Sequence, residues 1–91
     1  YGELSISPQA IIDIIQYLTE RTVQVYKVLD IKVRPADEAV EIVIIVSLTT
    51  GEHTFFDIGN KIRWKSARAI RYFTGMDIQK VNILVNGVFI K

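Results

Sequence analysis

A run of ten residues, Ala39–Leu48 ("AVEIVIIVSL"), constrains the fold more than any other part of the sequence. Apolar side chains occupy every second position, which is typical of a β-strand with one buried face. The opposite face is itself half apolar, because Val43 and Ile45 alternate with Glu41 and Ser47. The run therefore predicts a strand of which even the second face is only partly polar. Its fully apolar face carries Val40, Ile42, Ile44, Val46 and Leu48.

Three further segments alternate in the same way and predict three further strands. They are Glu3–Ser7, Val25–Pro35 and Val81–Ile90. In the second segment we expect one face to carry Leu29, Ile31 and Val33. In the last segment we expect Val81, Ile83 and Val85 on one side and Asn82, Leu84 and Asn86 on the other.

Two segments have the apolar period of amphipathic helices. Ser7-Pro8 reads as an N-cap followed by proline at the first helical position, and a stripe of Ile11, Ile14, Ile15 and Leu18 follows it. The second helix is expected to begin after Thr54, with Asp57 completing a capping box, and to stop at Gly75.

The resulting order is strand, helix, strand, strand, helix, strand. This order predicts an α+β fold, a β-α-β-β-α-β two-layer sandwich with a four-stranded sheet and two helices on one face. Its 91 residues suffice for one domain, residues 1–91. Because the first residue is Tyr1 rather than Met, we expect the chain to be a fragment of a longer protein.

Charge is distributed unevenly along the chain. The net charge is +1, but the segment Thr54–Thr74 carries five Lys and Arg against one Asp, a net charge of +4. On a helical wheel four of these five cations fall on one continuous face, together with one Trp and one Tyr, and Arg63 sits near its boundary. This basic binding face comprises Lys61, Trp64, Lys65, Arg68, Arg71 and Tyr72.

The basic face has two interpretations. It is either the solvated side of an ordinary helix or a patch for phosphate-bearing partners, namely nucleic acid or an anionic lipid headgroup. Trp64 and Tyr72 could stack on bases, sit at a membrane interface, or pack against a neighbouring subunit. Known RNA-binding modules fit poorly, since the apolar central run lacks aromatic residues and the glycines never form a GxxG loop.

No residue pattern indicates catalysis. Cysteine is absent, which excludes disulfides, cysteine metal sites and a cysteine nucleophile. His53, the only histidine, is expected to be a capping or surface residue, because no partner for it can be argued from spacing. No carboxylate cluster or phosphate-binding glycine loop appears. We therefore expect no enzyme, no cofactor and no metal.

The half-apolar strand face indicates a second candidate surface. If the helices cover the side of Ile42 and Ile44, then Val43, Ile45 and Leu84 lie on the uncovered face. Such a face either carries a few apolar residues in water or is covered by a second copy of the chain. We treat these three residues as a possible self-association face.

The two ends of the chain carry recognisable motifs, in Tyr1–Ile11 and Thr74–Val88. These motifs resemble the opening and closing signatures of the bacterial alkaline shock protein family, which has a cell-envelope-related function. The stretch after the first helix lacks the glycine that is usual there, and the compact chain is similar to the soluble domain of the family's membrane-anchor relative. The matching residues are Gly2, Ile6, Ser7, Thr74, Gly75, Val81, Asn82, Val85, Gly87 and Val88.

The resemblance implies a non-enzymatic bacterial protein in the cytoplasm, at the inner face of the cell membrane, that is related to envelope stress. Its implied partners are a second copy of the chain or a family paralogue, a membrane-anchor protein, or an anionic membrane surface. The function hypothesis is thus a membrane-proximal structural or interaction module. The alternative is a nucleic-acid-binding domain that uses the basic face of the second helix.

Overall fold

The first helix of the computed structural model, α1 (Pro8–Glu20), begins where the sequence predicts. The model describes residues 7–35, 40–75 and 78–90. Ser7 is the N-cap, and its side-chain oxygen accepts a hydrogen bond from the backbone N–H of Ala10 at 3.2 Å. The helix buries Ile11, Ile15 and Thr19, whereas Ile14 and Leu18 lie at the edge of the buried stripe.

The second helix, α2 (Phe55–Thr74), confirms both predicted ends. Thr54 accepts a hydrogen bond from the backbone N–H of Asp57 at 3.1 Å, which satisfies one of the free donors of the first turn. Gly75 ends the helix in the left-handed conformation, with φ of 72°, and its N–H donates to the carbonyl of Arg71. The buried side of α2 carries Ile58, Ile62, Ser66 and Ile70.

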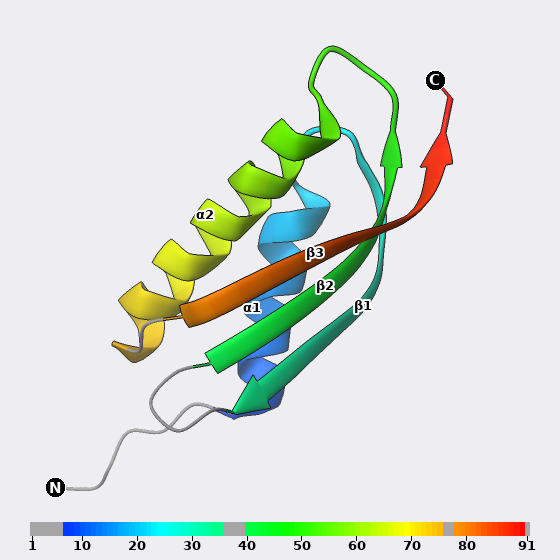
Figure 1. Ribbon diagram of the computed structural model, residues 1–91. Coiled ribbons are helices and arrows are strands. Elements are labelled where there is room, and N and C mark those ends of the chain that lie inside the picture. The colour runs from blue at the N-terminus through cyan, green and yellow to red at the C-terminus, as the bar shows by residue number, and fades with distance from the viewer. Residues whose placement is uncertain (1–6, 36–39, 76–77, 91) are drawn as a thin grey trace, which may run out of the picture.

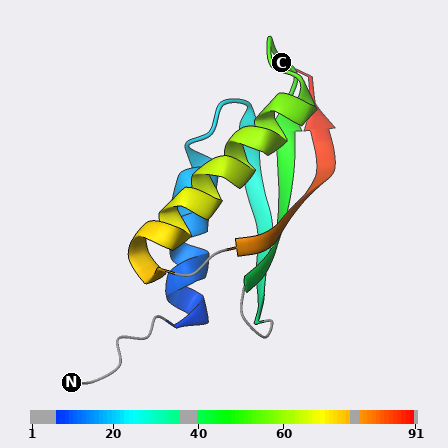
Figure 2. The same ribbon diagram turned by 60° about the vertical axis from the view of Figure 1, so that its left-hand side comes forward.

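The three strands of the described residues are β1 (Val25–Pro35), β2 (Val40–Thr49) and β3 (Ile78–Phe89). They lie side by side in the order β1-β2-β3, with β2 antiparallel to β1 and parallel to β3. Both helices cover the same face of this sheet (Figures 1 and 2). The domain therefore has two layers, as predicted, and no element of the described residues covers the other face of the sheet.

The prediction of a four-stranded sheet is wrong, because the sheet of the described residues has three strands. The expected first strand, Glu3–Ser7, falls outside the described residues apart from Ser7, which caps α1. In a split βαβ arrangement that strand would separate β2 from β3. Here β2 and β3 pair directly, with Ile44 beside Ile83, so both edges of the central strand are already occupied.

The core lies between the helices and the apolar face of β2. Buried isoleucines dominate it, and the predicted β2 positions Ile42, Ile44, Val46 and Leu48 are almost fully enclosed. Such burial of large β-branched side chains is the main source of stability in a domain of this size. The core comprises Ile11, Ile15, Ile31, Ile42, Ile44, Val46, Leu48, Ile58, Ile62, Ile70 and Val81.

Strand β1 departs from simple alternation. The pairing register with β2 shifts between Val28 and Asp30, so an extra β1 residue is accommodated there as in a β-bulge. As a result Val28 packs against the core, whereas Leu29, expected inside, is 42% exposed.

Val85 of β3, which was expected on the same side as the core residues Val81 and Ile83, is also exposed.

Candidate functional site

The outer side of α2 carries the predicted basic face. Trp64 and Tyr72 are 63% and 82% exposed, which is unusual for such large aromatic side chains. Lys61, Arg68 and Arg71 are exposed and Lys65 is half-buried. The basic and aromatic side chains thus share one accessible side of α2, opposite its buried isoleucines.

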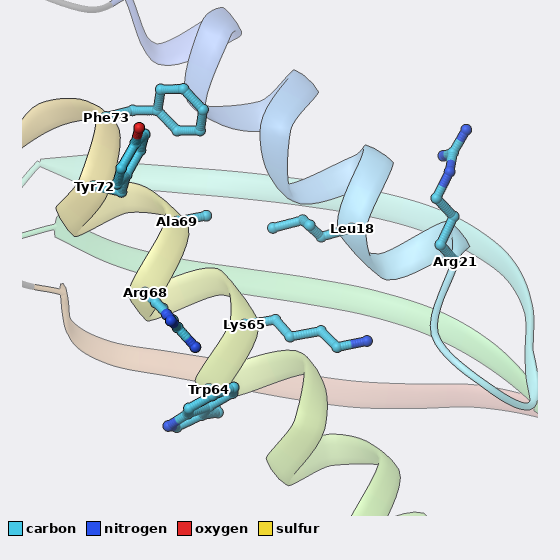
Figure 3. Close-up of a pocket in the computed structure, with 8 residues that line it drawn as sticks. All are labelled: Leu18, Arg21, Trp64, Lys65, Arg68, Ala69, Tyr72 and Phe73. Atoms are coloured by element: carbon cyan, nitrogen blue, oxygen red, sulfur yellow. The ribbon is translucent and has the colours of Figure 1, made fainter.

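A groove between α1 and α2 gathers four of these six residues into one place (Figure 3). It encloses about 420 Å3. Lys61 and Arg71 do not line it. Leu18 and Ala69 point toward one another across the gap between the helices (Figure 3). The lining residues are Leu18 of α1 and Arg21, which follows α1, with Trp64, Lys65, Arg68, Ala69, Tyr72 and Phe73 of α2.

Contacts between neighbouring side chains order the groove walls. The Arg68 guanidinium lies 5.2 Å from the Trp64 ring centroid, within the range of a cation–π contact. Tyr72 and Phe73 meet edge to face at 5.1 Å. The Arg21 guanidinium carbon lies 3.6 Å from the centroid of the Tyr17 ring. Arg21 Nη1 also donates a hydrogen bond to the backbone carbonyl of Tyr17. Each wall therefore presents positive charge next to an aromatic ring.

Sequence reasoning missed the contribution of α1 to this site. Arg21 stands three residues after Leu18, so the two side chains share one side of the chain at the end of α1. The three-residue spacing of Leu18 and Arg21 is the sequence signal for this side of the groove. Phe73, which the predicted basic face does not include, is exposed and also lines the groove.

A second hollow lies on the other side of Trp64, so the indole separates two depressions. Lys61 and Arg63 border this second hollow with Asn60 and Ala67. Arg63 is tied to the domain, since its Nε donates to the carbonyl of Val81 at 3.2 Å and its Nη1 donates to Asn60 Oδ1 at 2.8 Å. Arg63 therefore serves as a link between α2 and β3, and its guanidinium is less available to a partner.

The possible self-association face is on the uncovered side of the sheet. Ile45 pairs with Leu84 on one side and with Asp30 on the other, and Val43 pairs with Asn82 and Lys32. Leu84 is 52% exposed, and Val43 and Ile45 are half-buried. The three predicted residues thus form one contiguous apolar patch.

His53 lies in the loop between β2 and α2, and its backbone exchanges two hydrogen bonds with the side chain of Gln24. Within the described ranges, no group of three or more His, Cys, Asp and Glu residues is arranged to hold a metal ion. None of the helices in that part of the chain combines the length and the apolar character needed to span a bilayer.

Comparison with known proteins finds similar folds among solved structures. No protein-family model matches the chain, and no curated protein matches it. The similar solved structures include variants of MamM and of its C-terminal domain, the MamM CTD. One MamM variant has a TM-score of 0.74 at 14% sequence identity and covers 91% of this chain and 99% of that chain.

Two further structures give the same result. A copper form of a MamM CTD variant has a TM-score of 0.71 at 17% identity, covering 89% of this chain and 98% of that chain. Another MamM CTD variant has a TM-score of 0.70 at 17% identity, and the match covers 87% of this chain and 90% of that chain. At such identities the likeness establishes the α+β fold and no shared activity. The resemblance to the alkaline shock protein family stays a prediction.

Proposed function

We propose that this domain is a non-enzymatic interaction module that pairs with a second copy of itself through the uncovered face of its sheet. The observation that carries the proposal is the apolar patch of Val43, Ile45 and Leu84, on a face that no element of the described chain covers. A sheet face that is left to water normally carries mainly polar residues. Contiguous apolar area on the wet face is typical of an interaction site.

The surroundings of the patch suit self-pairing. Asp30 and Lys32 lie beside it on β1, and they are exposed. In a two-fold interface the same surface meets itself, so an acidic and a basic residue of one copy can face their opposites in the other. The stacked rings of Tyr26 and Phe89 extend the apolar area toward the end of β3.

The finer part of the proposal concerns location and partner. From the terminal motifs that resemble the alkaline shock protein family, we infer a role close to the inner face of a bacterial membrane, in envelope stress, with a paralogue as a further partner. The likeness to MamM concerns the fold alone, and it supplies no catalytic residue to transfer.

The test is the oligomeric state in solution, measured by light scattering and sedimentation over a range of protein concentrations. We expect a dimer that Leu84→Lys converts to a monomer, because a lysine there must be desolvated at the interface. Phe56→Lys is the matched control: Phe56 is 74% exposed on α2, away from the sheet face, and its replacement should leave the dimer intact. A monomeric parent chain, or a dimer unaffected by Leu84→Lys, would overturn the proposal.

A further inference from the structure

The groove between α1 and α2 combines an apolar floor with positive charge on both walls. Leu18 and Ala69 form the floor, and Phe73 closes one end (Figure 3). Arg21, the residue after α1, lines the groove with its guanidinium over the Tyr17 ring, while Lys65 and Arg68 contribute charge from α2. Among the residues that the structure describes, no carboxylate lines the groove. No described lining residue therefore neutralises these three cations.

The arrangement defines the chemistry of an occupant. An apolar side chain would bury itself between Leu18 and Ala69, and negative groups on either side of it would meet Arg21, Lys65 and Arg68. A groove beside packed helices is a recurring receptor for an amphipathic helix, which inserts anchors spaced three or four residues apart. Arginine is suited to carboxylates because its donors match the two carboxylate oxygens.

We propose that this groove binds an acidic amphipathic segment of another protein, whose large apolar side chain enters the recess while its carboxylates pair with Arg21, Lys65 and Arg68. The proposal goes beyond self-association, since it uses the helical layer and leaves the sheet face free. The domain then has one surface for its own copy and another for a different partner.

Two other classes of partner fit the geometry less well. A membrane is broad and would contact the protruding rings of Trp64 and Tyr72, leaving the recess at Leu18 and Ala69 unfilled. Single-stranded nucleic acid needs open ring faces for stacking, whereas Arg68 lies over the Trp64 ring and the Tyr72 and Phe73 rings meet edge to face. A recessed apolar floor with charges above it favours a peptide.

The chain carries its own reporter for the test, because Trp64 is its only tryptophan and it lines the groove. The probe is a synthetic helical peptide of about 15 residues with leucines along one face and glutamates beside them. We expect saturable binding seen as a change in Trp64 fluorescence. A second peptide, with serine in place of the leucines and the same charge, should bind at least about tenfold more weakly, since it lacks the anchor.

Matched variants separate the groove from general attraction to a positive helix. Arg68→Glu, inside the groove, should weaken binding about tenfold or more, because it replaces a favourable charge pair by repulsion. Lys61→Glu removes the same charge from the same helix outside the groove and should change affinity by only a few fold. Ala69→Leu keeps every charge and fills the recess, so it should also abolish binding of the leucine peptide. Circular dichroism would verify that each variant is folded.

The outcomes are distinct. Equal losses for Arg68→Glu and Lys61→Glu, or equal affinity for the serine peptide, would overturn the proposal in favour of nonspecific charge attraction. Binding to phosphatidylglycerol vesicles or to a uridine oligonucleotide without binding to the leucine peptide would overturn it in favour of a membrane or nucleic acid. Failure of self-association does not bear on it, since Leu84→Lys leaves the groove unchanged.

Discussion

Tyr26 of β1 and Phe89 of β3 stack with their ring centroids 4.4 Å apart, although the central strand β2 lies between the two strands. The rings lie at the end of the sheet where β1 begins and β3 ends. They therefore bridge the two outer strands across the end of β2. This contact joins segments more than sixty residues apart in the chain.

The first prediction concerns the energy of this contact. Tyr26→Ala and Phe89→Ala should each destabilise the domain, and a double-mutant cycle should give a coupling of about 0.5–1.5 kcal/mol, at the lower end because both rings are partly exposed. Urea unfolding at one fixed protein concentration measures it, since dimer formation would otherwise shift the apparent stability. Phe56→Ala, at an exposed ring without a ring contact in the described chain, should show no coupling to Tyr26→Ala.

Local signals explain why the helices and the core could be predicted. Ser7, Thr54 and Gly75 act within one turn of their helices, so their roles are visible in a short stretch of sequence. The buried face of β2 follows from strict alternation. The neighbours of a strand, in contrast, depend on long-range pairing, and for that reason the direct contact of β2 with β3 was missed.

The groove was missed for a related reason. Each helix contributes an ordinary polar side, and only their packing brings Arg21, at the end of α1, to the same groove as Lys65 and Arg68 of α2. The bulge near Val28 is likewise invisible without a pairing register, because one additional residue changes which side chains face inward. The sequence thus predicted the exposed basic residues but not the recess beside them.

Gln24 carries the second prediction. It adopts the left-handed conformation with φ of 63°, and its side chain holds the β2–α2 loop by donating to the carbonyls of Thr49 and His53 and accepting from the His53 N–H at 2.8 Å. Gln24→Ala should destabilise the domain by about 1–3 kcal/mol, because the backbone groups of Thr49 and His53 lose their hydrogen-bond partner. Gln24→Gly should cost about 1 kcal/mol less than Gln24→Ala, since glycine adopts this conformation without strain. Equal losses in urea unfolding would contradict this account.

A neighbouring glycine gives the third prediction. A Cβ atom at Gly51 would lie 2.7 Å from the side-chain carbonyl group of Gln24. Gly51→Ala must therefore displace a side chain that three hydrogen bonds hold, and we expect a loss of about 1 kcal/mol or more. In the Gln24→Ala background the obstacle is gone and the same change should be nearly neutral. An unchanged cost in that background, measured by urea unfolding, would show that the clash is not with Gln24.

Ser66 carries the fourth prediction. Its side chain is fully buried in α2, and its hydroxyl oxygen has no hydrogen-bond partner among the residues that the structure describes. Ser66→Ala should raise the free energy of unfolding by about 1–2 kcal/mol, because it removes an unsatisfied polar group and adds a better helix former. Thr19→Val is the comparison, since the buried Thr19 hydroxyl donates to the carbonyl of Ile15 at 2.7 Å and its removal should bring no such gain. A loss of stability in Ser66→Ala would mean that the hydroxyl is satisfied in solution.

Two glycines of the same helix region should respond to alanine with opposite signs. A Cβ atom at either Gly59 or Gly75 would meet nothing within 4 Å, so packing does not distinguish them. Gly59 lies inside α2, where alanine restricts the unfolded chain and favours the helix, and Gly59→Ala should stabilise by roughly 0.5–1 kcal/mol. Gly75 has a φ of 72°, and Gly75→Ala should destabilise by roughly 1–2 kcal/mol through backbone strain alone.

Thermal unfolding should therefore show melting temperatures displaced in opposite directions by a few degrees, about 4–8 °C per kcal/mol for a domain of this size. Gly75→Asn should lose less than Gly75→Ala, because asparagine tolerates the left-handed conformation better, and a shift of the same sign at both glycines would contradict the assigned backbone conformation.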